Sequence, residues 1–312
     1  MIKIAIIGAG YMAEEHIKAF QQIKLCQISA IISRSKEKVI KLAKKYRIPN
    51  IVSDIGQLKK ISKANLVVVT VPEIEKYGIM KRIIIFDWLI FIEKPVGYNL
   101  VESNKIELLA KINKRKVLVA HNRRFYSSVM KALKDIEKNN KAKRFIHIQD
   151  QQSFEEARRY NHPEKVVKNF MYANSIHLID LIFVFCRGKV KKIQNIKPWK
   201  GERTEIVLSF IEFSSGDSAI YEGIWKGPGP WSCTITTKDK RWSLKPLENL
   251  EIQEYGSRCQ NKIPIDSVDF DFKPGLIVQS KNVINFLKNK PNTSVTISES
   301  NKTMKLIKDI FT

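Results

Sequence analysis

The stretch Ile4-Ala5-Ile6-Ile7-Gly8-Ala9-Gly10-Tyr11-Met12-Ala13 decides the fold of this chain. An apolar strand runs into a glycine turn, and helical spacing follows directly. Gly8 permits the tight turn, Gly10 lets a pyrophosphate approach the backbone, and Ala13 allows the helix to pack closely on the strand. The free N–H groups and the positive dipole end of that helix attract phosphate. The stretch therefore predicts a dinucleotide-binding unit.

The rest of the first 120 residues alternates strand and helix. Further strands are expected at Ile28–Ile32, Leu66–Thr70, Leu89–Glu93 and Val117–Ala120, with a helix at Lys36–Tyr46. The run at Leu66–Thr70 is rich in β-branched residues, as expected of a strand that is buried on both faces. Such alternation predicts a doubly wound parallel sheet with right-handed crossovers.

After residue 121 the pattern changes to consecutive strands. Strand-like pieces at Glu205–Phe213, Ser218–Trp225, Ser232–Thr237 and Arg241–Leu244 are separated by turns, which predicts an antiparallel sheet. Helical spacing is expected in four segments: Tyr126–Glu137, Pro163–Cys186, Leu276–Leu287 and Ser298–Phe311. The domain boundary is therefore expected near residue 120.

Composition limits the class of protein. The 312 residues are 44% hydrophobic, enough for two domains with sizeable cores. No apolar run reaches the roughly 20 residues that span a bilayer. The start shows no signal peptide, and the four cysteines show no CxxC pairing. We therefore expect a cytoplasmic protein with free thiols, no metal site and no membrane partner.

The net charge of +24 raises the question of an anionic partner. The positive residues are mostly lysines, scattered singly or in pairs, and no basic run is interleaved with aromatic residues as single-strand binders require. We expect no specific nucleic-acid partner. The charge forms a solvated surface or helps to attract a phosphorylated substrate.

The residues after the second strand indicate the cofactor type. A carboxylate there would hold the ribose 2′-hydroxyl of NAD. This chain has Ser33-Arg34-Ser35 instead. Hydroxyls and a guanidinium suit a 2′-phosphate, so NADP(H) is favoured over NAD(H). Alternatively, Arg34 is an exposed turn residue and the backbone holds the ribose.

A second motif, Glu93-Lys94-Pro95, ends an apolar strand whose carboxyl end should face the nicotinamide. A lysine there can hydrogen-bond a substrate hydroxyl and ease its deprotonation. The alternative is a surface lysine at a strand end.

With these motifs the chain resembles the glucose-fructose oxidoreductase/inositol dehydrogenase/MocA family over nearly its whole length. The resemblance rests on Gly8-Ala9-Gly10, on Glu93-Lys94-Pro95 with Asn99-Leu100, on His121–Phe125 and on Ser175–Asp180. It implies an α/β plus α+β fold. A Rossmann domain at 1–120 would precede an open-faced, mostly antiparallel sheet domain at 121–312 that binds substrate and oligomerises. It also implies that the Lys94–Pro95 bond is cis.

The resemblance implies roles for particular residues. Lys94 and His177 would be catalytic: His177 would exchange a proton with a sugar hydroxyl, and Lys94 would orient the same oxygen. A histidine in such a helical stretch is otherwise a packing residue, and Asp180 orients the ring or supports the structure. The residues expected to contact the cofactor are Gly8, Gly10, Tyr11, Met12, Ser33, Arg34, Ser35, Thr70, Pro72, Glu93 and Lys94.

Substrate contacts are expected from Asn122, Tyr160 and Asn174. Asn122 is otherwise a turn former, and the basic, aromatic segment 158–162 around Tyr160 suits a phosphorylated sugar or a solvated loop. Arg123 and Arg124 pair between domains or touch substrate. Tryptophans at 225, 231 and 242 mark an interface on an open sheet, which predicts a homodimer or homotetramer, or they cover the core beneath it.

The chain departs from the family pattern at two places. The family commonly has an aspartate four residues before the histidine, where this chain has Ala173, and glycine is usual where Ser175 stands. The family also often has a histidine about four residues past the Thr-Pro step, where this chain has Glu73-Ile74-Glu75-Lys76. The first change removes a carboxylate that would bind substrate and tune the catalytic pair.

The sequence therefore predicts an NAD(P)-dependent oxidoreductase. It would move a hydride between nicotinamide and a hydroxyl or ketone of a sugar or sugar nucleotide, as in surface-polysaccharide sugar biosynthesis. The alternative is a cofactor-binding sensor or regulator of the same fold, which Ala173 favours and the presence of Lys94 and His177 opposes.

Overall fold

The computed structural model describes residues 1–312, which divide into two compact units. The first unit comprises Met1–Asn122 and Asp271–Asn301, and the second unit comprises Arg123–Phe270 and Lys302–Thr312. None of the helices has the length and hydrophobicity needed to cross a bilayer.

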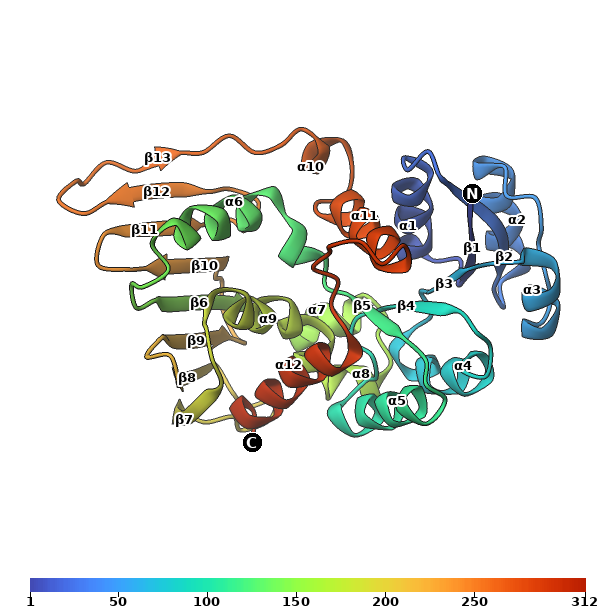
Figure 1. Ribbon diagram of the computed structural model, residues 1–312. Coiled ribbons are helices and arrows are strands. Elements are labelled where there is room, and N and C mark those ends of the chain that lie inside the picture. Colours follow the sequence, from blue (N-terminus) through green and yellow to red (C-terminus); the bar gives the residue numbers. More distant parts are fainter. The chain divides into compact units, whose positions relative to one another are not determined.

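The first unit is built on a parallel sheet of five strands in the order β2-β1-β3-β4-β5 (Figure 1). Every neighbouring pair of strands runs parallel. The strands are β1 Ile2–Ile7, β2 Cys26–Ile32, β3 Leu66–Val69, β4 Leu89–Glu93 and β5 Val117–Ala120. The predicted Rossmann-type sheet is confirmed.

Both faces of this sheet are buried, which explains why its strands are apolar without alternation. In β1, Ile4 and Ile6 enter the core on one face, whereas Ala5 and Ile7 enter the core on the other. One face packs against α1 Tyr11–Gln21, α2 Lys36–Tyr46 and α11 Leu276–Leu287, and the other against α3 Ile55–Ser62, α4 Lys76–Ile83 and α5 Leu100–Ile112.

Helix α11 belongs to this unit although it lies far along the chain. Its Val283 and Ile284 are buried in the same core as Ile17 and Phe20 of α1. The compact unit therefore extends beyond the predicted N-terminal segment, because α11 completes the core on the α1 face.

The second unit contains an eight-stranded sheet in the order β13-β12-β11-β10-β6-β9-β8-β7. All neighbours are antiparallel except β6 and β9. The strands are β6 Phe145–Gln151, β7 Val190–Lys197, β8 Ile206–Phe213, β9 Ser218–Ile224, β10 Trp231–Thr236, β11 Lys240–Leu244, β12 Glu251–Glu254 and β13 Asn261–Lys262. The expected, mostly antiparallel sheet is thus confirmed.

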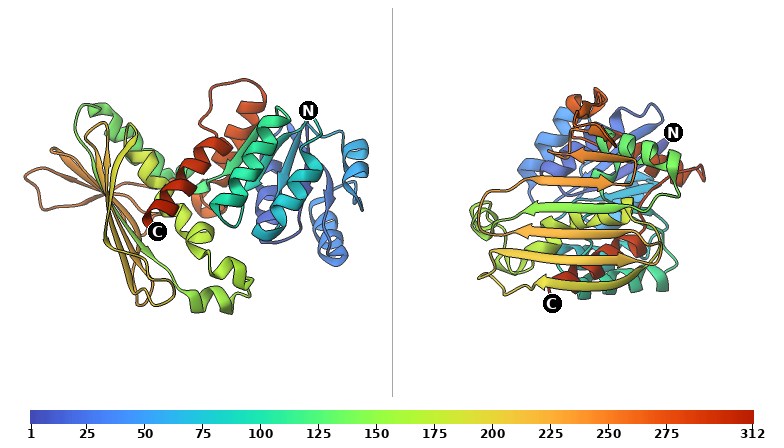
Figure 2. Two further views of the ribbon diagram at one scale, coloured as in Figure 1. Left: turned by 90° about the horizontal axis from the view of Figure 1, so that it is seen from below. Right: turned by 90° about the vertical axis from the view of Figure 1, so that its left-hand side faces the viewer.

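Helices cover only one face of the second sheet. That face carries α6 Ser127–Ile136, α9 Ile176–Phe185 and the end of α12 Ile297–Ile310, whereas the other face is bare of helices (Figure 2). Strand β6 shows the consequence, since Ile146 and Ile148 are buried, whereas His147 and Gln149, which alternate with them, are only half-buried. The sheet is therefore open-faced.

The predicted helical segment from residue 163 to 186 is interrupted. It contains α8 Glu164–Val167, a wider π-turn at Met171–Ser175 and then α9. Such π-turns insert an extra residue into the helical ladder and are frequent at functional sites. The other short elements are α7 Phe154–Arg159, α10 Val268–Asp271 and the 3₁₀ turns Glu73–Glu75, Asn122–Phe125 and Glu137–Asn139.

Two of the three tryptophans expected on an exposed interface lie in the core instead, whereas Trp231 is half-buried. Trp225 and Trp242 are buried. Trp225 packs 4.6 Å from Phe154 and 4.7 Å from Trp199, measured between ring centroids. These indole rings fill the core beneath the sheet, because their large apolar area is most stable there.

Candidate functional site

The strand order of the first unit creates a switch point between β1 and β3. The chain runs from β1 to β2 on one side and returns to β3 on the other. Ligands of open α/β sheets bind outside the carboxyl ends of the strands at such a point. Here those ends are Gly8, after β1, and Thr70, after β3.

Gly8 and Thr70 touch each other at this edge. The Thr70 N–H and Oγ1 both donate to the Ile7 carbonyl, at 2.9 and 3.1 Å. Gly8 has a φ of +123°, and an added Cβ would lie 2.3 Å from Thr70 Oγ1. Both the backbone conformation and the close approach of Thr70 therefore require glycine at this turn.

Gly10 serves a different purpose. It begins α1 with extended backbone, φ −87° and ψ −173°, and no side chain caps the helix. Apart from the adjoining residues of the chain, no protein atom lies within 4 Å of the position that its Cβ would take. The uncapped N–H groups and the open space above Gly10 fit the pyrophosphate of a dinucleotide.

Aromatic and basic groups flank this opening. Tyr11, the first residue of α1, is 64% exposed, and Met12 beside it is half-buried. The Lys273 ammonium lies 5.2 Å from the centre of the Tyr11 ring. Sequence reasoning missed Lys273, since the chain brings it to α1 through the distant segment before α11.

The residues after β2 lie at the same edge. Arg34 is exposed, and its Nη1 donates to Glu75 Oε1 at 3.1 Å. Glu75 ends the 3₁₀ turn that Pro72 introduces, and Ser35 begins α2. The guanidinium expected to bind a 2′-phosphate thus contacts a carboxylate that the sequence pattern did not identify.

The Glu93-Lys94-Pro95 motif follows β4 at the next strand end. The Lys94–Pro95 bond is cis, as expected. His16 of α1 is fully buried, and its Nε2 lies 2.7 Å from Glu93 Oε1. Burial raises the pKa of the Glu93 carboxyl, but the hydrogen bond from His16 and the charges of Lys94 and Lys76 outweigh it, so the net pKa is lowered. The carboxyl group is therefore held as an anion.

Lys76 is fully buried beneath the same motif. Its Nζ donates to the carbonyl of Glu93 at 2.6 Å and to that of Pro95 at 2.5 Å. Burial lowers the pKa of Lys76, whereas the nearby Glu73, Glu93 and Glu102 raise it less. The lysine noted in the sequence only as a departure from a family pattern is thus a buried cation next to Lys94.

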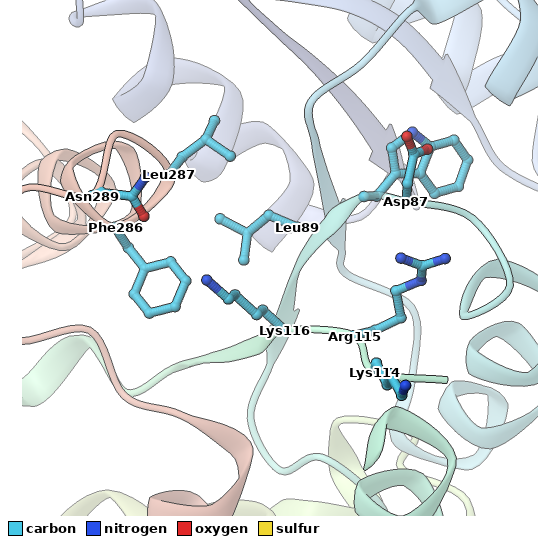
Figure 3. Close-up of a pocket in the computed structure, with 9 residues that line it drawn as sticks. Asp87, Leu89, Lys114, Arg115, Lys116, Phe286, Leu287 and Asn289 are labelled. Atoms are coloured by element: carbon cyan, nitrogen blue, oxygen red, sulfur yellow. The ribbon is translucent and has the colours of Figure 1, made fainter. Parts of the chain in front are cut away.

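A cavity of about 240 Å³ lies at the opposite edge of the first sheet, where β4 and β5 begin (Figure 3). Its charged groups already have neighbours: Arg115 donates to the carbonyls of Ile84 and Ile85, and Lys116 lies over the Phe286 ring. Because dinucleotides bind at the carboxyl ends of parallel strands, this cavity is not the cofactor site.

In the second unit, His177 lies at the start of α9 and is 4% exposed. Arg123 Nη1 lies 2.9 Å from His177 Nε2, and the Trp231 ring centre is 6.1 Å from the imidazole. A guanidinium only donates hydrogen bonds, so Nε2 must be the acceptor. In this contact the Nε2 lone pair of His177 is therefore directed at Arg123, and the proton of a neutral imidazole would be on Nδ1.

Asp180, one turn after His177, is tied into the protein. Two nitrogens of Arg124 donate hydrogen bonds to its carboxylate, at 2.6 and 2.7 Å, and Thr303 Oγ1 donates a third at 2.9 Å. Such a bidentate pair fixes both partners in one orientation. The contacts of Asp180 within its unit thus anchor α9 to neighbouring segments.

The π-turn before His177 rests on a buried polar network. Asn174 donates to Gln152 Oε1 at 2.9 Å, and Gln152 in turn donates to Asp150. Tyr221 Oη donates to Asp150 at 2.7 Å. Burial raises the pKa of Asp150 to about 6, although these hydrogen bonds partly offset the effect. Ala173, in place of the family's aspartate, is also buried in this turn.

The remaining predicted substrate residues differ in position. Asn122 is 4% exposed and donates to the Pro274 carbonyl at 3.1 Å, which holds the segment that carries Lys273. Tyr160 is 76% exposed at the end of α7.

Lys94 belongs to the first unit and His177 to the second. No group of three histidine, cysteine or acidic side chains is arranged to hold a metal ion.

Sequence reasoning missed His16, Lys76, Lys273 and Asp150. His16 lies on the same helical stripe as Ala13 and Phe20, so its burial could have been expected from spacing alone. Lys76 follows directly after an acidic turn, which was a weaker signal. Nothing in the pattern around Lys273 or Asp150 separates these residues from surface ones.

Comparisons with known proteins agree with this geometry. Residues 2–121 match the family model GFO_IDH_MocA, described as an oxidoreductase family with an NAD-binding Rossmann fold. The resemblance expected from the motifs is thereby confirmed. No curated protein matches the chain.

Solved structures share the fold along nearly the whole chain. An NADPH-dependent oxidoreductase from Desulfitobacterium hafniense has a TM-score of 0.79 at 19% identity, covering 97% of this chain and 92% of that one. UDP-N-acetylglucosamine 3-dehydrogenase from Acidithiobacillus ferrooxidans has a TM-score of 0.77 at 13% identity, covering 98% and 95%.

An oxidoreductase from Agrobacterium radiobacter, solved with NAD+, L-tartaric acid and magnesium, has a TM-score of 0.77 at 13% identity, covering 98% and 94%. At these identities the likeness concerns the fold alone. The likeness in fold covers the second sheet as well as the first.

Proposed function

We propose that this chain is an NAD(P)-dependent dehydrogenase of a sugar or sugar nucleotide, because residues 2–121 match the oxidoreductase family model GFO_IDH_MocA. The observation that carries the proposal is the seat at Gly10, an uncapped helix start with open space at the switch point of the sheet. Bound nicotinamide would supply the hydride acceptor or donor.

In this proposal the first unit holds the cofactor through distinct groups. The N–H groups of α1 above Gly10 bind the pyrophosphate, with Tyr11 and Met12 at its edge. Gly8, Thr70 and Pro72 shape the crevice between β1 and β3. Ser33, Arg34 and Ser35 take the 2′-phosphate, so NADP(H) is preferred over NAD(H).

Lys94 and His177 are proposed as the catalytic pair. During oxidation, His177 takes the proton of the substrate hydroxyl while the carbon gives up its hydride, and a ketone forms. In the reverse direction the same imidazole returns the proton. The Lys94 ammonium holds the substrate oxygen and stabilises its developing negative charge. For this proton transfer, Nε2 of His177 must exchange its contact with Arg123 for one with the substrate hydroxyl.

Asn122, Tyr160 and Asn174 are proposed to contact the sugar. Asn122 and Asn174 each donate an amide N–H within the protein, which holds both side chains in place. We further propose that the chain works as a homodimer or homotetramer through the open face of the second sheet. Surface-polysaccharide sugar biosynthesis is the proposed setting.

One observation favours a second candidate, a cofactor-binding sensor that does not turn over substrate. Ala173 is buried where the family commonly has an aspartate, so a carboxylate partner of His177 is missing from the π-turn. A sensor would bind NAD(P) but would not need Lys94 or His177.

Binding and turnover together test the proposal. The purified protein is titrated with NADPH and NADH while energy transfer from its tryptophans is followed. It is then assayed with UDP-activated and free sugars at a saturating concentration of the preferred cofactor. Binding with turnover that Lys94→Met or His177→Asn abolishes supports the enzyme. Binding with no turnover on any sugar favours the sensor, and no binding of either cofactor contradicts both.

A further inference from the structure

The strongest unexplained feature of the first unit is the buried ammonium group of Lys76. Lys76 is 1% exposed and begins α4, directly after the 3₁₀ turn at 73–75. Lysine is almost never fully buried in proteins unless it is paired, because removing an ammonium from water costs several kcal/mol. A lysine in this position therefore needs a reason beyond filling space.

The ammonium group bridges the two residues that flank Lys94. It donates to the Glu93 carbonyl at 2.6 Å and to the Pro95 carbonyl at 2.5 Å. Hydrogen bonds from a charged donor are short and about twice as strong as neutral ones. The backbone is thus held on both sides of Lys94 by one side chain from another helix.

A second contact holds the same segment from the opposite helix. The Glu93 carboxylate accepts a hydrogen bond from His16 of α1 at 2.7 Å. The imidazole packs edge-on against Phe91 of β4, with ring centres 5.3 Å apart. Glu93 is therefore fixed through its carbonyl by α4 and through its side chain by α1, the helix that begins at Gly10.

We propose that Lys76 is a positioning residue for Lys94: its buried ammonium group ties the carbonyls of Glu93 and Pro95 together and keeps the turn that carries Lys94 in one conformation. This inference rests on the proposed function, in which Lys94 is catalytic. A misplacement of a catalytic group by about 1 Å can lower the rate a hundredfold. A rigid turn would therefore keep Lys94 in its productive position.

The charge environment of Lys76 agrees with this role. Burial lowers the pKa of Lys76, and the acidic groups Glu73, Glu93 and Glu102 oppose that effect. A methionine at this position would remove the cost of burying a charge, but it would leave two carbonyls without their donor. A buried carbonyl that loses its donor destabilises the folded state. Removing the buried charge and removing the donor change the free energy of unfolding in opposite directions. Only the loss of the donor loosens the turn that carries Lys94.

The test compares Lys76→Met with Lys81→Met, a matched change at an exposed lysine on the same helix. Amide hydrogen exchange is measured on both variants and on wild type without any ligand. We expect exchange in Lys76→Met to rise about tenfold at Lys94, Val96 and Gly97 only, since local opening reports local stability. Lys81→Met should match wild type.

Kinetics provide the second readout. With NADPH affinity unchanged, kcat of Lys76→Met should fall about tenfold to a hundredfold while KM changes little, because Lys94 is misplaced rather than lost. Lys76→Gln keeps one amide donor and should fall between wild type and Lys76→Met. It also replaces Lys76→Met if that variant does not fold.

Two results would overturn the inference. One is exchange and kcat in Lys76→Met that equal those of wild type. The other is faster exchange spread over the whole first unit, which would mark Lys76 as a general stability residue. If wild type shows no turnover on any sugar, the proposed function fails, whereas the exchange comparison still decides whether Lys76 holds the turn.

Discussion

Arg34 Nη1 lies 3.1 Å from Glu75 Oε1, so the guanidinium expected to bind a 2′-phosphate faces a carboxylate in the unliganded protein. Both side chains are substantially exposed, and such a pair contributes about 0–1 kcal/mol. A 2′-phosphate can therefore displace Glu75, but it must also approach a negative charge.

We accordingly predict that Glu75→Gln strengthens NADPH binding about two- to fivefold and leaves NADH binding unchanged, because the competing carboxylate is lost. Arg34→Ala should weaken NADPH binding and remove the effect of Glu75→Gln in the double variant. Tryptophan energy transfer measures the dissociation constants. Glu73→Gln is the control, since it removes the same charge from the same turn. Equal changes for both cofactors would contradict the prediction.

Substitutions of the two glycines in the first turn should have different effects, one on stability and the other on cofactor binding. Gly8→Ala places a methyl group on Thr70 at a positive φ, so the free energy of unfolding should fall by about 1–3 kcal/mol. Gly10→Val meets open space in an extended backbone and should keep the wild-type Tm. Its side chain would fill the pyrophosphate seat, which should weaken NADPH binding by about tenfold or more. Thermal melts and titrations check both variants; a Gly10→Val protein that binds normally would place the pyrophosphate elsewhere.

His177→Asn should lower kcat/KM by about 10²- to 10⁴-fold, the usual contribution of a general base. Its NADPH affinity and Tm should stay near those of wild type, because the proposed dinucleotide residues belong to the first unit. Steady-state kinetics on the best sugar substrate decide the matter, and undiminished turnover in His177→Asn would remove His177 from the mechanism.

Asp150 should make stability depend on pH. Burial raises its pKa to about 6 in the folded protein, above the ordinary value of 3.8. Between these two values the folded state binds more protons than the unfolded state, so the free energy of unfolding falls as pH rises. The loss is about 3 kcal/mol at most and is complete above pH 6. Urea unfolding at pH 4.5, 5.5 and 7 measures this slope.

The matched variant for this slope is Asp150→Asn, which keeps the shape of the side chain but cannot ionise. The difference in unfolding free energy between wild type and Asp150→Asn should shift in favour of the variant as pH rises from about 4 to 6. A difference that stays constant across this range would show that Asp150 does not titrate there.

The proposed cofactor site was largely visible in the sequence, because local rules govern its backbone. Gly8 and Gly10 follow an apolar strand, and the need for a positive φ or an open backbone is expressed by the residue itself. The Lys94 motif was equally visible as a short run after a strand. The partners of these residues were not. Other segments of the chain contribute Glu75, His16 and Lys76. In a lysine-rich chain, the sequence does not indicate which lysine is buried.

By itself, the sequence determined the parallel sheet of the first unit, the mostly antiparallel strands of the second and the glycine turn between β1 and α1. Strand alternation, apolar runs and glycine positions express backbone preferences that act over a few residues. Only the tertiary structure decided that α11 completes the first core, that Lys76 holds the turn of Lys94, and that Asp150 lies under the π-turn before His177. Those contacts join residues far apart in the chain, and their energies depend on burial, which exists only once the chain has folded.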